Sequence, residues 1–102
     1  MCMEEYNVRI LSSARIDILD VVEHLNTLAP DEAAQYYDLL TERVEALRFS
    51  PEHRPPVKDT QLRLRGYRTL PFNDYTALFV IKGDTVEIRR VLYSKRQYEW
   101  LL

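Results

Sequence analysis

The apolar positions at the start of the chain change their period from two residues to 3.6. Tyr6, Val8 and Ile10 alternate with polar residues, which predicts a strand over residues 6–11. The pair Ser12-Ser13 that follows is typical of a helix start. The next apolar side chains share one face of a helix that we expect to end near residue 26: Ile18, Val21, Val22 and Leu25.

A second helix is predicted after a break at residues 28–31. Pro30 is accepted in the first turn of a helix, and apolar side chains keep the helical period as far as Leu47. Pro51 disfavours helical geometry in Ser50, so the helix should end there. Two amphipathic helices joined by so short a loop form a helical hairpin.

The second half of the chain combines a proline-rich loop with three β-like runs. We expect the loop at residues 51–61 and the runs at 62–72, 75–81 and 85–93, separated by the turn signals Asn73-Asp74 and Lys82-Gly83-Asp84. The expected fold class is α+β, with an N-terminal strand and then the helical hairpin packed on one face of an antiparallel β-meander. A short C-terminal helix or tail follows, and the other sheet face should carry polar side chains.

Composition narrows the class of protein. The 102 residues make a single domain, residues 1–102, and 46% hydrophobic residues suffice for a core. No apolar run approaches the ~18 residues of a membrane span, and we expect no signal peptide. One cysteine, Cys2, fits a reduced, cytoplasmic setting. Two histidines with one cysteine, and only two glycines, give no reason to expect a metal or cofactor.

The charges divide between the two halves of the chain. Residues 1–53 carry four arginines against eleven acidic residues, a net charge of −7, whereas residues 54–102 carry ten basic residues against five acidic ones, a net charge of +5. A basic half of this kind favours a surface that faces an anion. The alternative is a fold whose surface charges balance internally.

Basic and aromatic side chains are interleaved in the late strands. Arginine matches phosphate oxygens and exposed tyrosine stacks on unpaired bases, so the pattern suits single-stranded RNA. The candidates for binding RNA or another target are Arg63, Arg65, Arg68, Arg89, Arg90, Lys95 and Arg96, with Tyr67, Tyr75, Tyr93 and Tyr98 among them.

Arg89 and Arg90 interrupt the alternation of the last strand. Neither of its two faces is purely apolar at this pair. Two structures would explain the pattern: a bulge that shifts the register, or an Arg90 that is buried and paired. A paired structural arginine and a functional one remain open alternatives for Arg90.

Several motifs, taken in chain order, resemble those of the RelE/ParE superfamily of bacterial type II toxins. The first is the A-x-x-D-I pattern of residues 14–18 after a strand, and the second is an L-x-x-x-P helix end at residues 47–51. Gly66-Tyr67-Arg68-Thr69-Leu70 and Tyr75 follow. The most specific segment, residues 88–96, is similar to the family ending I-x-R-V-x-(H/Y)-x-x-R.

This resemblance implies a microbial-ribonuclease-like fold, a cognate antitoxin and inhibition of growth, as in plasmid stabilization systems. RelE-like members are ribosome-dependent endoribonucleases, or mRNA interferases, and ParE-like members inhibit DNA gyrase without a known nuclease activity. For RNA cleavage the resemblance implies Arg68 and Arg96 at the scissile phosphate, with Tyr93 or Tyr98 in proton transfer or stacking. The remaining candidates would bind RNA or another target: Arg63, Arg65, Arg90 and Lys95.

Two positions depart from the RelE-like pattern. Thr76 and Leu70 stand where RelE-like enzymes often carry basic residues, which favours the ParE-like group. We nevertheless expect first a RelE-like toxin that cleaves mRNA on the ribosome. The alternatives are a ParE-like gyrase inhibitor and a non-toxic α+β binding module. A homodimer and a toxin–antitoxin hetero-oligomer are the assemblies to be considered.

Overall fold

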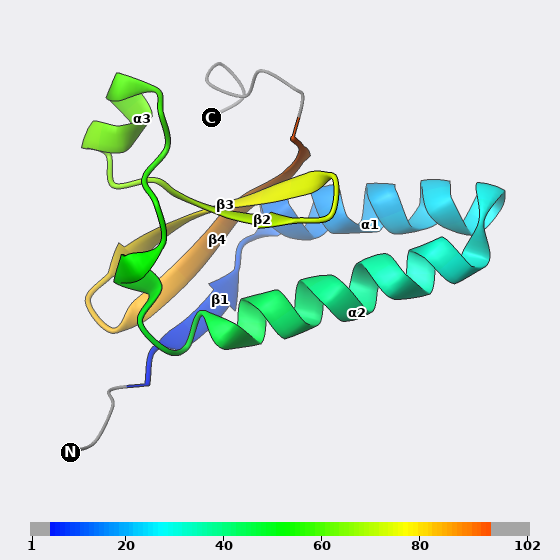
Figure 1. The fold of residues 1–102 in the computed structure, drawn as a ribbon, viewed down its shortest axis with the longest axis horizontal. Helices are drawn as coiled ribbons and strands as arrows, with labels where there is room; N and C mark the ends of the chain where they lie inside the picture. Colours follow the sequence, from blue (N-terminus) through cyan, green and yellow to red (C-terminus); the bar gives the residue numbers. More distant parts are fainter. Residues whose placement is uncertain (1–4, 95–102) are drawn as a thin grey trace.

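A computed structural model describes residues 5–94 as two helices packed on one face of a four-stranded sheet (Figure 1). The elements in chain order are β1 (Asn7–Ile10), α1 (Ser12–Leu28), α2 (Pro30–Ala46), the 3-10 turn η1 (Pro51–His53), α3 (Thr60–Leu64), β2 (Arg68–Phe72), β3 (Tyr75–Lys82) and β4 (Thr85–Tyr93). The α+β prediction is confirmed. The expected C-terminal helix or tail lies outside the described residues.

The sheet is mixed, with the strand order β1-β4-β3-β2. β2, β3 and β4 form the predicted antiparallel meander, while β1 pairs in parallel with β4, Val8 lying opposite Val86. The helical hairpin is therefore the crossover that returns the chain to the same sheet. Among residues 5–94 there is no helix with the length and apolar character that a membrane crossing requires.

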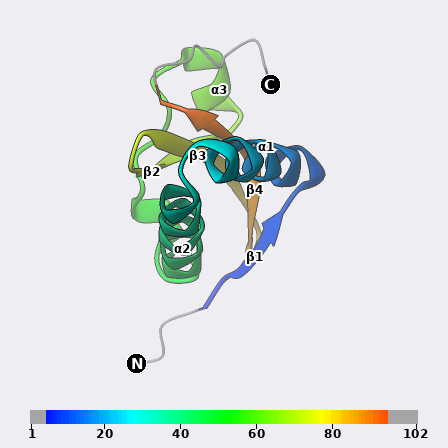
Figure 2. The same ribbon diagram turned by 90° about the vertical axis from the view of Figure 1, so that its right-hand side faces the viewer.

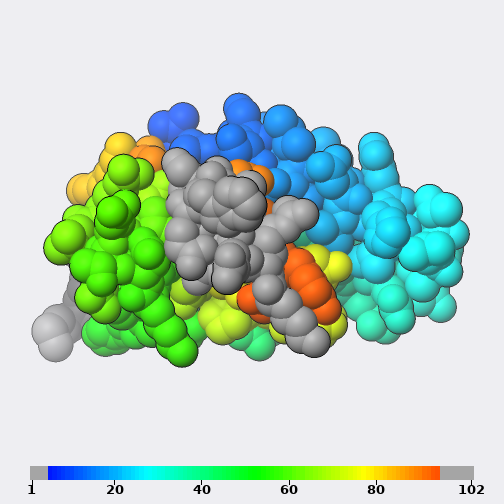
Figure 3. Space-filling view, turned by 90° about the horizontal axis from the view of Figure 1, so that it is seen from above, coloured from blue at the N-terminus to red at the C-terminus, as the bar shows by residue number. Residues whose placement is uncertain are grey.

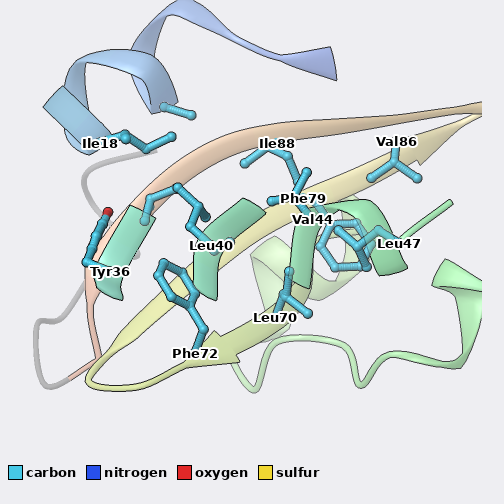
Figure 4. Close-up of a cluster of buried hydrophobic side chains, with 13 residues drawn as sticks. Ile18, Tyr36, Leu40, Val44, Leu47, Leu70, Phe72, Phe79, Val86 and Ile88 are labelled. Atoms are coloured by element: carbon cyan, nitrogen blue, oxygen red, sulfur yellow. The ribbon is translucent and has the colours of Figure 1, made fainter. Parts of the chain in front are cut away.

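The two helices meet at a sharp junction. α1 continues two residues beyond its expected end, and Ala29 alone separates it from α2, whose first residue is Pro30. Figure 2 looks along the helices and shows α1 and α2 as neighbours. Their inward side chains and those of the strands form the main core, in which Phe72, Phe79 and Ile88 are almost inaccessible (Figure 4).

The outer face of the sheet, opposite the hairpin, is less polar than predicted. A second apolar cluster covers part of it: Val57, Leu62, Tyr67, Leu78, Val80 and Leu92. The expectation of a strand at residues 62–64 is also wrong, because these residues end α3. The Asp59 carboxylate accepts a hydrogen bond from the backbone N–H of Leu62 at 3.0 Å, which caps the helix and turns Leu62 inward.

β4 contains the bulge that its sequence pattern allowed. Leu78 pairs with Arg90 while the next residue, Phe79, pairs with Ile88, so Arg89 is the extra residue. The shift brings Val91 into the main core with Ile88.

Candidate functional site

A hollow of about 420 Å³ opens on the outer face, between α3 and the β3–β4 hairpin. We call it the cationic hollow, and its lining residues are Arg65, Tyr67, Val80, Ile81, Lys82 and Arg89. The short α3 places Arg65 at its C-terminal end, and the hairpin places Lys82 and Arg89 on adjacent strands. Three cations therefore share one concave surface with one aromatic ring.

Arg89 is the most constrained cation of the hollow. Its Nη2 donates a hydrogen bond to Glu87 Oε1 at 2.9 Å, and its guanidinium carbon lies 5.8 Å from the centre of the Tyr67 ring. Its Nε is buried and has no hydrogen-bond partner in the part of the chain that the structure describes. These contacts hold the guanidinium plane in a fixed position.

The Glu87 carboxylate faces two cations of the hollow, Lys82 and Arg89. Lys82 Nζ lies 3.8 Å from the Glu87 oxygen that Arg89 binds. The hydrogen bond from Arg89, assisted by the charges of Lys82, Arg89 and Arg9, lowers the pKa of Glu87 below its ordinary value despite partial burial. Glu87 is thus ionised and a weak base at neutral pH. Three positive charges against one negative charge leave the hollow suited to bind an anionic group.

Of the predicted binding residues, Arg65 lies in the hollow and Arg63 is exposed two residues earlier, on α3. In the sequence Arg89 is one of many basic residues of the late strands, and Lys82 stands in a turn signal with no mark of a binding role. The available signal was the position of Lys82 at the hairpin turn, within reach of the acidic residue Glu87 on the paired strand.

Arg68, predicted as a catalytic residue, binds the chain's own backbone. Its Nη1 donates to the Arg54 carbonyl at 2.7 Å, and Arg54 Nε donates in return to the Thr69 carbonyl at 3.3 Å. These two hydrogen bonds fasten the proline-rich loop to β2.

Arg90 takes part in an ion pair with α1. Its Nε and Nη2 donate to the Asp17 carboxylate at 2.7 and 3.0 Å, and the Val91 N–H donates to the same carboxylate at 2.9 Å. The pKa of Arg90 is raised, chiefly by the hydrogen bond to Asp17. Both structures allowed by the alternation of β4, the bulge and the paired arginine, are therefore present together.

Tyr93 is exposed at the end of β4 and contacts Tyr75 edge-on, with ring centres 5.8 Å apart. Three further predicted site residues lie outside the described residues: Lys95, Arg96 and Tyr98. No group of three His, Cys, Asp or Glu residues placed to hold a metal occurs between residues 5 and 94.

The charge division of the sequence becomes a division in space. Seen from above, α3 and the loop before it lie at the left end of the molecule and the α1–α2 junction lies at the right end (Figure 3). Residues 12–46, which include both helices, carry two arginines against eight acidic residues. The cationic hollow and the acidic hairpin thus occupy different parts of the surface.

Comparison with known proteins identifies the family. The model of the "ParE toxin of type II toxin-antitoxin system, parDE" family matches residues 8–98. No curated protein matches the chain. Similar solved structures include a chain of the chromosomal ParDE toxin–antitoxin system from P. aeruginosa, with 21% identity, a TM-score of 0.75, and coverage of 90% of this chain and 99% of that chain.

A second similar structure is a chain of the RelBE2 toxin–antitoxin complex from Mycobacterium tuberculosis, with 23% identity, a TM-score of 0.61, and coverage of 90% and 94%. At these identities the two structures support the fold, while the family model spans most of the sequence. The chain belongs to the ParE toxin family of type II toxin–antitoxin systems.

Proposed function

We propose that this toxin arrests growth by holding a macromolecular target through the cationic hollow, as a ParE-like inhibitor of DNA gyrase, without cleaving RNA. The match to the ParE family supports this choice of target. The geometry of the hollow supports the choice of surface, because its three cations and Tyr67 form a binding site rather than an acid–base pair.

The observation that carries the proposal is the separation of Arg68 from Tyr93. Their partners on β3 are Phe79 and Tyr75, which are four residues apart, or about 13 Å along the strand. β2 and β4 are also two strand spacings apart, about 10 Å. Groups that act on one phosphate must lie within hydrogen-bond reach of it, and Arg68 is already bound to the Arg54 carbonyl.

RNA cleavage in the RelE manner is the second candidate. The exposed Arg63 and Arg65 on α3 favour it, because accessible guanidinium groups suit the phosphates of a nucleic acid strand. In this alternative Arg68 and Arg96 would bind the scissile phosphate, and Tyr93 would assist proton transfer.

We also infer a cognate antitoxin as the partner that neutralises the toxin. Both similar structures are named as parts of toxin–antitoxin assemblies. Acidic and apolar segments of an antitoxin would dock on the basic surface by electrostatic steering followed by burial. A hetero-oligomer of toxin and antitoxin is therefore the assembly expected in the cell.

Controlled expression without an antitoxin tests these proposals. We expect growth to stop, purified toxin to block supercoiling by gyrase, and mRNA on translating ribosomes to stay intact in end-mapping. The double variant Arg65→Glu/Lys82→Glu should restore growth, whereas Lys58→Glu, a like change on an exposed loop lysine, should remain toxic.

Two outcomes would contradict the proposal. Cuts in ribosome-bound mRNA with normal supercoiling would favour the RelE-like alternative, and Arg68→Ala combined with Arg96→Ala should then abolish the cuts. Normal growth at a high yield of folded protein would exclude both toxin mechanisms and leave a binding module.

A further inference from the structure

A second hollow lies on the helix-facing side of the sheet, where the α1–α2 hairpin meets the β2–β3 turn. Its volume is about 310 Å³, at the lower end of the range for ligand pockets. α1 contributes Leu25 to its wall. We call it the acidic tyrosine pocket, and its other lining residues are Glu32, Gln35, Tyr36, Asn73, Asp74 and Tyr75.

The Tyr36 hydroxyl is the most unusual group in this pocket. Tyr36 is only 2% exposed, yet its hydroxyl oxygen is buried with no hydrogen-bond partner among residues 5–94. Figure 4 shows the side chain at the border of the main core, with the hydroxyl directed away from Phe72. An unsatisfied buried hydroxyl is costly to folding, so its retention here calls for a ligand that hydrogen-bonds to it.

Two aromatic rings, those of Tyr36 and Tyr75, belong to residues that line the pocket, and Phe72 packs behind Tyr75. The Tyr36 and Tyr75 rings meet edge-on with centres 4.9 Å apart, and Phe72 stacks on Tyr75 at 6.0 Å. The negative faces of such rings attract cations, and a planar cation stacks on them.

The charged side chains that line the pocket, Glu32 and Asp74, are both acidic. Arg43 lies on the same helix as Glu32, but its Nη1 donates to the Pro71 carbonyl at 3.3 Å. The pKa of Tyr75 is consistent with a negatively charged pocket. It is raised chiefly by burial and then by the charges of Asp74, Tyr93 and Glu32. Burial, then Tyr75 and Asp17, likewise raise the pKa of Tyr36. Both hydroxyls are therefore neutral and able to accept a hydrogen bond.

We propose that the acidic tyrosine pocket binds a guanidinium group. Its N–H donors would reach Glu32, Asp74 and the Tyr36 hydroxyl, and its plane would stack on the partly exposed Tyr75 ring. A metal ion fits less well, because two carboxylates at a rim are too few ligands for Ca²⁺ or Mg²⁺. The guanidinium belongs either to an arginine side chain of a partner polypeptide or to a free small molecule.

The test is an NMR titration of the full-length protein, followed through the amide signals of Asn73 and Asp74, at constant ionic strength. Three probes are compared: N-acetyl-argininamide, its neutral isostere N-acetyl-citrullinamide, and agmatine. We expect saturable shifts with N-acetyl-argininamide and at least tenfold weaker binding of the citrulline compound. Tighter binding of N-acetyl-argininamide than of agmatine would assign the site to a partner's arginine, and the reverse order would assign it to a free cation.

Matched variants complete the test. Glu32→Gln/Asp74→Asn should weaken N-acetyl-argininamide binding at least tenfold, whereas Glu42→Gln, the same charge change on an exposed part of α2, should leave it unaltered. Tyr36→Phe should weaken binding several-fold without lowering the melting temperature, since the hydroxyl it removes has no partner among the described residues. Absence of saturable shifts, or equal binding of the citrulline compound, would overturn the proposal whatever the result of the gyrase assays.

Discussion

The helix-facing side of the sheet buries thirteen of the described residues in one core, whereas the outer face buries six beneath α3 and its loop. The larger core joins five elements, and the smaller one depends on a five-residue helix capped by Asp59. Most of the stability therefore comes from the side of the sheet that α1 and α2 cover. The thinly covered outer face holds the cationic hollow, where side chains can change with little effect on the fold.

The strongest contrast should appear when one core residue is truncated on each face. Phe79, on the helix-facing side, and its neighbour Leu78, on the outer side, are both fully buried. We expect Phe79→Ala to lower the free energy of unfolding by about 4 kcal/mol and Leu78→Ala by about 3 kcal/mol, from lost burial and the cavities left behind. Urea denaturation measures both. A larger loss for Leu78→Ala would contradict the division of stability drawn above.

The second largest loss of stability is expected when the ion pair between α1 and β4 is broken. Asp17→Asn removes the carboxylate charge that faces the partly buried Arg90 guanidinium, and we expect a loss of about 3 kcal/mol. Arg90→Met in the Asp17→Asn background should recover part of this loss, because the partly buried guanidinium is then absent. Thermal unfolding of the single and double variants provides the comparison, and purely additive losses would show that the two residues are not coupled.

The third prediction concerns how stability changes at acidic pH, which should depend on Glu87 on the outer face of the sheet. The pKa of Glu87 is lowered in the folded protein, chiefly by the hydrogen bond from Arg89. Its contribution is therefore present above the ordinary pKa of 4.5 and is lost as the pH falls through the lowered value. We expect the melting temperature of Glu87→Gln to fall less than that of the natural protein between pH 6 and pH 3. Parallel profiles would contradict the assigned cause.

The smallest effect is expected at Ser50, where the chain passes from α2 to the proline-rich loop. Ser50 has a φ of 53°, in the left-handed region that glycine adopts without strain. Ser50→Gly should leave stability unchanged or raise it by roughly 0.5 kcal/mol, since relief of strain is offset by greater freedom of the unfolded chain. Calorimetry resolves a change of this size, and a clear loss would indicate that the serine side chain has a role in the crossing.

Local periodicity was sufficient to predict most of the secondary structure. The helices have long amphipathic faces, and β3 and β4 are rich in β-branched and aromatic residues, so their signals extend over many positions. The alternation at Arg89 and Arg90 also pointed to the bulge and the paired arginine that the structure contains.

What the sequence concealed depends on contacts between distant segments. The parallel pairing of β1 with β4 and the contact of Arg90 with Asp17, 73 residues away, have no local signature. α3 was missed because five residues give too short a period, although Asp59 is a good N-cap residue. The cationic hollow joins Arg65 to a hairpin distant in sequence, so only the folded chain brings Lys82 beside Arg89.

The position of Asp17 has a consequence for association between copies of the chain. β1 ends at Ile10. Beyond it the Asp17 carboxylate accepts the hydrogen bond from the Val91 N–H, which a strand of another copy could otherwise accept. At the opposite border, the Pro55 carbonyl accepts the N–H of Thr69, and Pro56 bridges Arg68. One carboxylate and two prolines thus shield these stretches of backbone from edge-to-edge aggregation.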